Sequence, residues 1–336
     1  MLDRIARDRV ATLFIVTVLV LLAVGAAAPG FLSVRTAGII WSNGLVLMLV
    51  ALGIFPVILT RNIDVSGGSV LGLSAVTLGL TLNQGLPLPL ASAAALGTGL
   101  LAGALSGLLV AVLRVPSIVA TLGTLGLFRG VMLIATGGEW IEDLPEDLKA
   151  LGAKSFAGLS VMGMVTAGAI LAVWLFLRSR RGGWVFVTGD NRAAAHHLGL
   201  PVKRIEFLVF VWGGAMYALA GIAFAAQIGF VPNQAGSGIE LRAIAALVLG
   251  GISLLGGVGT VAGVVIGVIF FTSIDTSLVF LRIPAYWNDL IGGAMLLAVL
   301  LIDGRLRIAL EARDRAARYR RSGHRISPTR DLEDAA

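Results

Sequence analysis

One short polar stretch interrupts a long apolar region: residues 59–75 read LTRNIDVSGGSVLGLSA. The carboxylate of Asp64 could transfer a proton, bind a polar ligand or accept hydrogen bonds at the start of a helix. Ser66 and Ser69 could bind the same kind of ligand, and the adjacent glycines Gly67 and Gly68 would let a helix break beside a cavity. We expect Asp64 or Ser66 to cap the next helix at its cytoplasmic end. A direct role in a transport path is the alternative.

The rest of the chain offers little that could catalyse a reaction. It has no cysteine, and none of its three lysines follows a glycine-rich phosphate-binding loop. The adjacent histidines His196 and His197 have no further ligand at metal-binding spacing. We therefore expect no catalytic residue, no metal and no cofactor in this chain. The other ionisable candidates in apolar segments stand mostly near segment ends, so a carrier that moves protons is poorly supported: Arg129, Glu240, Asp275 and Asp289.

Composition indicates the class of protein that must position these residues. Hydrophobic residues make up 57% of the 336 residues, charged residues only 13%, and the mean hydropathy is +0.94. A soluble domain carries about 25% charged residues. We predict an all-α, polytopic integral membrane protein, with one transmembrane domain over 1–303 and a basic cytoplasmic tail over 304–336. The tail is expected to be partly disordered and to contact lipid headgroups.

About ten spans are expected, or eight if two segments are re-entrant. The third, fifth and eighth are short or polar enough to be re-entrant or broken. In chain order the expected spans are 11–28, 37–59, 66–82, 89–113, 117–136, 158–177, 204–227, 241–257, 259–281 and 284–303.

Charge predicts the orientation of these spans. The loop 178–204 carries six Arg or Lys and one Asp, and the tail carries nine Arg against five acids. The loop 137–157 carries five acids and two Lys. Because positive loops stay in the cytoplasm, the first two segments and both termini should be cytoplasmic, and the acidic loop external.

Two glycine ladders predict close helix packing. Gly99, Gly103 and Gly107 repeat every four residues, and so do Gly259, Gly263 and Gly267. Glycines at this spacing make a flat stripe along one helix face, which lets a second helix approach closely. The alternative is that glycine is simply common here, with 44 residues in the chain.

The basic loop contains a predicted short helix. The segment GDNRAAAHHLGLPVKR, residues 189–204, places Asp190 or Asn191 at an N-cap and Gly199 at a helix stop before Pro201. A rigid cytoplasmic helix between two spans suits docking of a partner protein, although a plain connecting helix would have the same pattern.

Four segments resemble a known family. Ala194-Ala195-x-x-x-Gly199 resembles the EAA loop of binding-protein-dependent ABC importer permeases, with Ala193 in place of the usual glutamate. NIDVSGGSVLGLSA, VPSIVATLGTLGLFRG and ELRAIAALVLGGISLLGGVGTVAG resemble the ribose-type branch of that family, in the same order along the chain. Within the branch, TGGEWIEDLPEDLK (136–149) and QIGFVPNQAGSGIE (227–240) resemble autoinducer-2 (Lsr-type) import permeases.

This resemblance implies a permease subunit of the bacterial inner membrane. It would pair with a second permease, a paralogous chain, and receive cargo from a periplasmic substrate-binding protein. A cytoplasmic ATP-binding subunit would hold ATP and Mg and dock at Gly189, Asp190, Asn191, Ala194, Ala195 and Gly199. The cargo would be autoinducer-2, and the alternative cargo is a monosaccharide such as rhamnose or ribose. The alternative to the importer itself is a stand-alone secondary carrier. The candidate helix-break and path residues are Asp64, Ser66, Gly67, Gly68, Ser69, Thr121, Thr124, Gly250, Gly251 and Ser253.

Overall fold

The computed structural model describes residues 2–156, 159–284, 287, 290–294 and 297. The chain divides into a large unit, Met1–Asn288, and a small one, Asp289–Ala336. In the small unit only residues 290–294 and 297 are described, and they are helical. The predicted tenth span lies mostly outside the described residues, and the predicted basic tail lies entirely outside them.

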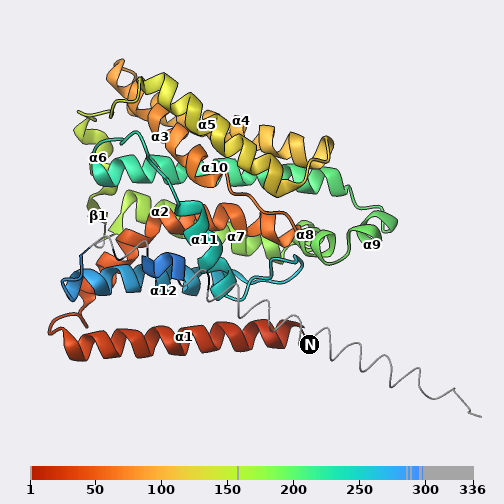
Figure 1. The fold of residues 1–336 in the computed structure, drawn as a ribbon, viewed down its shortest axis with the longest axis horizontal. Helices are drawn as coiled ribbons and strands as arrows, with labels where there is room; N and C mark the ends of the chain where they lie inside the picture. The colour runs from red at the N-terminus through yellow and green to blue at the C-terminus, as the bar shows by residue number, and fades with distance from the viewer. Residues whose placement is uncertain (1, 157–158, 285–286, 288–289, 295–296, 298–336) are drawn as a thin grey trace, which may run out of the picture. The chain divides into compact units, whose positions relative to one another are not determined.

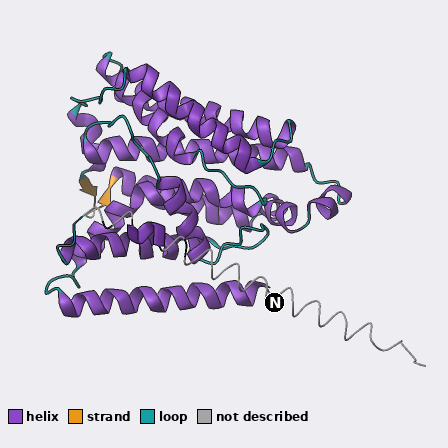
Figure 2. Cartoon of the chain, in the orientation of Figure 1, coloured by secondary structure: helices purple, strands orange, loops and turns teal. Residues whose placement is uncertain are grey.

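The large unit consists almost wholly of helices, most of which run along one common direction (Figure 1). Two short strands, β1 (Lys154–Phe156) and β2 (Leu159–Ser160), pair antiparallel and are orange in Figure 2. The helices are α1 (Leu2–Ala27), α2 (Val34–Leu59), α3 (Gly67–Asn83), α4 (Leu88–Gly107), the π-helix η1 (Leu108–Val112), α5 (Ser117–Thr136), α6 (Glu146–Gly152), α7 (Val161–Arg178), α8 (Arg180–Asp190), α9 (Arg192–His197), α10 (Val202–Ile228), α11 (Ile239–Leu249) and α12 (Val261–Phe280).

Seven helices in the described part of the chain are long and apolar enough to cross a membrane. They are α1, α2, α4 continued by η1, α5, α7, α10 and α12. Among the shorter helices, α3 has 17 residues and α11 has 11. The prediction of a polytopic, all-helical membrane protein is confirmed, while the count of ten spans and the side on which each terminus lies stay predictions.

Of the three spans expected to be short or broken, the third and the eighth are short: α3 has 17 residues, and α11 ends at Leu249, before the expected bound of 257, with a loop after it. The expectation is wrong for the fifth, because α5 is one unbroken helix of 20 residues over Ser117–Thr136. The loop after α11 forms because Gly251, Gly256 and Gly257 take positive φ angles of 83°, 82° and 70°, which are incompatible with a continuing right-handed helix.

The centre of the large unit is α2, whose residues from Gly44 to Leu59 are all buried. It contacts α10, α12, α11 and α7, so it is covered on several sides. By contrast α1 lies at the edge against α12, and Phe14, Ile15 and Leu19 on it are more than half exposed. Such apolar side chains face lipid in a membrane-spanning helix, because lipid tails need no covering protein.

The first glycine ladder faces α10. A Cβ atom at Gly99 would collide with the carbonyl oxygen of Gly214, and one at Gly103 with that of Phe210. At Gly107 the added atom would lie 3.0 Å from the Phe207 oxygen. The backbones of α4 and α10 are therefore in direct contact, which only a stripe of glycines allows.

The second ladder is not a single helical stripe as expected. Gly263 and Gly267 lie on α12, where added Cβ atoms would collide with the carbonyl oxygens of Gly250 and Ala246. Gly259 precedes the helix, because Thr260 caps it by accepting a hydrogen bond from Gly263 N at 3.0 Å. Gly259 instead lies in the loop, where its added Cβ would be 2.8 Å from the Phe55 ring.

Candidate functional site

The polar stretch forms a non-helical segment, residues 60–66, between α2 and α3. Its backbone is satisfied by hydroxyls from the start of α5. Ile63 N donates to Ser117 Oγ at 3.1 Å, and Val65 N donates to Thr121 Oγ1 at 3.3 Å. Open backbone inside a membrane protein must find such partners. Thr121, predicted as a path residue, thus holds the segment in place.

Asp64 is the buried centre of this segment, with 1% of its surface exposed. Its Oδ1 accepts hydrogen bonds from Ser66 N at 2.9 Å and Ser66 Oγ at 2.6 Å, and its Oδ2 accepts one from Tyr217 OH at 3.1 Å. The expectation that Ser66 caps α3 is wrong, because α3 begins at Gly67 and the side chain of its N-cap residue Ser66 makes no cap bond. Asp64, the other candidate, accepts the bond from the backbone N–H of Ser66 directly before the helix. The Ser66 hydroxyl is hydrogen-bonded to Asp64, and Asp64 alone is hydrogen-bonded to Tyr217.

Tyr217 reaches Asp64 because two glycines leave room for its ring. Tyr217 is 1% exposed and lies in the middle of α10. A Cβ atom at Gly53 would lie 2.6 Å from its Cε1, and one at Gly67 would lie 3.1 Å from the same atom. The sequence reasoning missed this tyrosine, because one aromatic residue in an apolar helix carries no signal of its partner.

A second acid lies next to this cluster. Glu240, in the first turn of α11, is 7% exposed, and its Oε2 has no hydrogen-bond partner among the described residues. Gly68 packs so closely on it that an added Cβ would collide with Glu240 Oε2 and with the carbonyl oxygen of Gly236. Glu240 was expected near a span end, where charge is tolerated, but it is enclosed by the loop 229–238 and α3.

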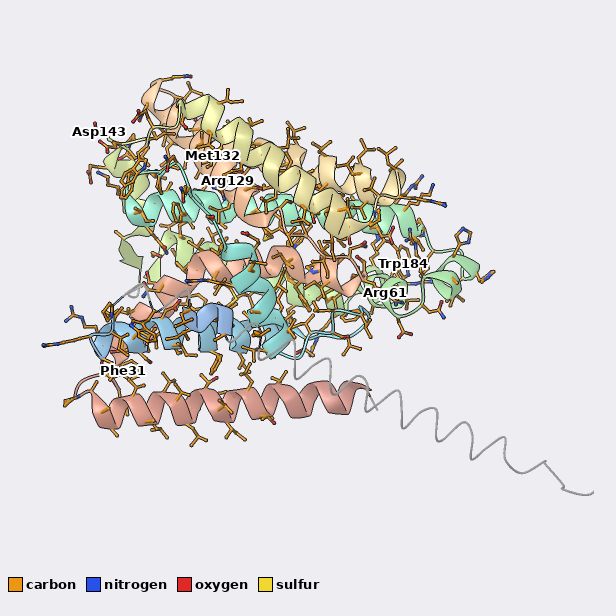
Figure 3. The ribbon with its side chains drawn as sticks, in the orientation of Figure 1. Phe31, Arg61, Arg129, Met132, Asp143 and Trp184 are labelled. Carbon is orange, nitrogen blue, oxygen red and sulfur yellow. The ribbon has the colours of Figure 1, made fainter. Side chains whose placement is uncertain are left out.

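Arg129 on α5 holds the same loop. Its Nη1 donates to the carbonyl oxygen of Ala235 at 2.8 Å, and it is close enough to Glu240 for their charges to attract. Met132, one helical turn further, lies beside Gly72 of α3 (both α5 residues are labelled in Figure 3). A cation, two acids and a tyrosine therefore gather where the N-termini of α3 and α11 meet. Broken helices that meet inside a membrane are typical of transport sites.

The predicted path residues fall into two groups. Ser66, Ser69, Thr121 and Thr124 are buried around the Asp64 segment. Gly250, Gly251 and Ser253 belong to the loop after α11, where Gly250 packs against Gly263 of α12. That loop touches the end of α2, since Gly257 N donates to Leu59 O at 3.0 Å.

The basic loop contains two helices rather than one. Asn191 caps α9 by accepting a hydrogen bond from Ala194 N at 2.9 Å, and Gly199 follows with a φ of 73°. These contacts confirm the predicted short helix with its cap and glycine stop. The preceding residues form α8, whose end packs on the core: a Cβ at Gly189 would collide with Leu59 O (Figure 3 labels the nearby Arg61 and Trp184).

The six predicted docking residues therefore differ in exposure. Asn191 and Gly199 are exposed and Ala194 is half-buried, whereas Ala195 and Gly189 are buried. Asp190 lies against Gly257 and is exposed on its other side. Docking at these residues stays a prediction.

At the opposite end from α8 and α9 (Figure 1), the acidic loop is fastened to the loop 229–238. Ile141 and Val231 form a β-bridge, Trp140 stacks on Phe230 with ring centroids 5.4 Å apart, and Asn233 Nδ2 donates to Gly138 O at 2.8 Å. Movement of the acidic loop would thus reach the loop that encloses Glu240.

The fold and this site define a multi-pass membrane protein whose two short helices meet at buried acids. Residues 36–300 match the model of a family described as branched-chain amino acid transport system, permease component. The chain belongs to this family of ABC importer permeases, and it is a multi-pass protein of the inner membrane. As a permease subunit it is not itself an enzyme, and it acts in a complex with other subunits.

Several relatives match over nearly the whole chain. The autoinducer 2 import system permease protein LsrC of Salmonella typhi is 50% identical, covering 100% of this chain and 96% of its own. The protein of the same name from Escherichia coli strain SMS-3-5 is 51% identical over 96% and 94% of the two chains. That from Enterobacter sp. strain 638 is 53% identical over 87% and 86%. No solved structure gives a significant match.

Proposed function

We propose that this chain carries autoinducer-2 across the inner membrane as the permease subunit of an ABC importer. The observation that carries the proposal is the 50% identity, over the full length, to permeases that bear this function in their name. The match covers the whole chain and so includes the acidic loop and the loop 229–238, which supports a shared cargo because surface loops are where relatives of different specificity differ most.

A separate ATP-binding subunit docks on α9 and holds ATP and Mg²⁺, so this chain needs no cofactor of its own. A second, paralogous permease completes the pore. A periplasmic binding protein delivers the cargo to the acidic loop, whose carboxylates suit a basic rim: Glu139, Glu142, Asp143, Glu146 and Asp147.

Movement of the docking helix reaches the buried acids through backbone contacts. Gly189, just before α9, presses on Leu59, and Gly257 N is hydrogen-bonded to the same carbonyl. Leu59 is followed directly by the segment that carries Asp64. A shift of α9 on ATP binding therefore pulls the Asp64 segment, while the binding protein acts from the other side through the loop 229–238. The Asp64–Tyr217 and Gly68–Glu240 contacts form the gate between the two.

The chemistry of the gate suits a small, hydroxyl-rich cargo. Carboxylate oxygens accept hydrogen bonds from hydroxyls, and Glu240 Oε2 is an acceptor without a described partner. Ser66 and Tyr217 add hydroxyls that both donate and accept. When the gate opens, a polyol can replace the contacts that these groups make with each other.

Reconstitution into proteoliposomes tests the proposal. With the ATP-binding subunit, the second permease and the binding protein, labelled autoinducer-2 should accumulate only when ATP is present. Ribose and rhamnose should accumulate much more slowly. Faster uptake of either sugar would mean that this sugar, and not autoinducer-2, is the cargo. Uptake by this chain alone, without ATP, would rule out the importer.

A further inference from the structure

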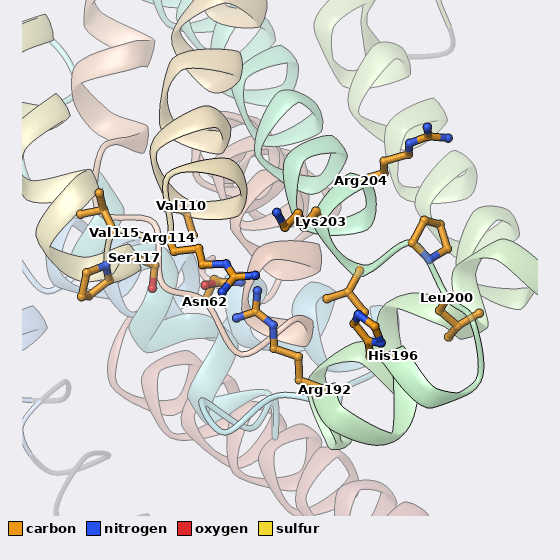
Figure 4. Close-up of a pocket in the computed structure, with 13 residues that line it drawn as sticks. Asn62, Val110, Arg114, Val115, Ser117, Arg192, His196, Leu200, Lys203 and Arg204 are labelled. Carbon is orange, nitrogen blue, oxygen red and sulfur yellow. The ribbon is translucent and has the colours of Figure 1, made fainter.

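A basic cavity of about 560 Å³ lies at the end of the molecule that carries α8 and α9 (Figure 4). It forms where the segment 60–66, the turn between η1 and α5, α9 and the start of α10 come together. Asn62, Ser117 and several apolar residues line it. The other lining side chains are five cationic or titratable ones: Arg114, Arg192, His196, Lys203 and Arg204. Among the described residues lining the cavity there is no acid.

One buried acid behind the wall offsets part of this charge. Glu206 is 2% exposed, and its Oε2 accepts a hydrogen bond from Arg192 Nη2 at 2.9 Å. Arg114 and Asn62 also interact with Glu206. One carboxylate cannot balance three arginines and one lysine, so the cavity keeps a net positive charge.

The backbone at Arg114 aims its side chain at the cavity. Arg114 has a φ of 59°, a left-handed conformation that costs a non-glycine residue about 1 kcal/mol. The turn is held by Leu113 N donating to Leu108 O at 3.0 Å and Val115 N donating to Leu109 O at 3.0 Å. Figure 4 shows the guanidinium groups of Arg114 and Arg192 turned toward each other beside Asn62. Glu206 attracts both of these guanidinium groups, and Lys203 and Arg204 add two further positive charges to the same cavity.

We infer that this cavity binds a small phosphate-bearing anion. Arginine holds phosphate oxygens through paired N–H groups, and lysine adds a point charge. The volume exceeds that of a phosphate group and leaves room for a small polyol attached to it, which Asn62 and Ser117 can hydrogen-bond. A free phosphomonoester and an anionic lipid headgroup share this chemistry. We assign the cavity to the soluble phosphomonoester, because the segment 60–66, the turn before α5, α9 and the start of α10 all contribute to its walls.

An anion bound in the cavity would slow transport, a consequence that rests on the proposed function. The anion bridges Arg192 on α9 and Arg114 before α5, beside Asn62, which is two residues from Asp64. It would thus hold the docking helix and the gate segment in the arrangement described here.

Binding to the full chain in phosphatidylcholine nanodiscs tests the site without any transport. Glycerol 3-phosphate and inorganic phosphate should raise the thermal unfolding midpoint, glycerol should not, and added salt should weaken the effect. Arg114→Gln and Lys203→Gln should each lower the affinity for glycerol 3-phosphate about tenfold. Arg181→Gln removes the same charge from the exposed start of α8, outside the cavity, and should leave the affinity unchanged.

Two outcomes of the binding experiment would overturn the assignment. Stabilisation by phosphatidylglycerol alone would make the cavity a lipid site. If Arg181→Gln lowered the affinity for glycerol 3-phosphate equally, the binding would arise from general surface charge rather than from the cavity. In proteoliposomes, cytoplasmic glycerol 3-phosphate should lower ATP-driven uptake, with each variant normalised to its own uptake without phosphate. Normal binding without inhibition would leave the site and remove its regulatory role, whereas absence of any uptake would count against the proposed function only.

Discussion

Asp64 accepts hydrogen bonds from Ser66 N, Ser66 Oγ and Tyr217 OH, although almost none of its surface reaches solvent. A buried carboxylate without such donors would be strongly destabilising. The bond to Tyr217 joins the start of α3 to the middle of α10, two elements far apart in the sequence. Single polar side chains thus determine how the two parts of the gate meet.

Substituting each partner of this bond, singly and together, measures the interaction energy between Asp64 and Tyr217. Tyr217→Phe leaves one oxygen of Asp64 without its donor, and Asp64→Asn replaces one acceptor by an amide donor. Each variant should lower the free energy of unfolding by about 1–3 kcal/mol. The double variant should lose less than the sum, because both changes remove the same bond. Thermal unfolding of all four proteins in one detergent measures this, and strictly additive losses would mean that the bond contributes nothing.

Gly68 tests the second contact of the gate. Gly68→Ala places a Cβ against Glu240 Oε2 and the Gly236 carbonyl, so α3 and α11 must move apart. Uptake should fall at least tenfold, or ATP hydrolysis should become independent of cargo. Gly126→Ala is the matched control, because Gly126 is helical and has no atom within 4 Å of an added Cβ. Equal effects of the two variants would assign the loss to the helix backbone rather than to the gate.

At the scale of elements, the short helices α3 and α11 adjoin non-helical segments, and neighbouring helices contact the backbone of these segments. The segment before α3 is held by hydroxyls of α5, and the loop after α11 is held against α2 and α12. In the same way α8 links α9 to the core through Gly189. A docking helix that was attached only by flexible chain could not transmit force to the gate.

The turn after α9 provides a test of docking. Gly199 has a φ of 73° and no atom within 4 Å of an added Cβ, so strain and docking can be separated. Gly199→Asn should be well tolerated, since asparagine adopts this conformation readily. Gly199→Glu should insert and fold but reduce ATP-driven uptake at least tenfold by placing charge in the docking surface. ATPase and uptake assays on the same vesicles measure both, and normal uptake by the glutamate variant would remove Gly199 from the interface.

At the scale of the whole molecule, the basic helices and the acidic loop lie at opposite ends of the bundle (Figure 1). This separation agrees with the orientation that the charges predict, in which α8 and α9 are cytoplasmic and residues 137–157 are external. In that orientation the proposed gate, the proposed docking helix and the basic cavity form one continuous connection from the cytoplasmic end to the buried acids.

Cysteine labelling tests this orientation directly, because the natural chain has no cysteine. A membrane-impermeant maleimide should modify Asn62→Cys only from the cytoplasmic side and Glu142→Cys only from the external side. Labelling of both from the same side would contradict the orientation. His197→Cys, on the exposed surface of α9, serves as the cytoplasmic reference.

The sequence by itself determined the class, most helix positions and the capped helix α9, because long apolar runs and local caps depend on neighbours along the chain. It also pointed to Asp64 and the glycines beside it. Only the tertiary structure decided that Asp64 bonds Tyr217, that Gly68 packs on Glu240, that Gly259 leaves the helical stripe and that four cations surround one cavity. These features depend on contacts between residues far apart in the sequence, such as Asp64 with Tyr217 and Gly68 with Glu240, for which one sequence carries no local pattern.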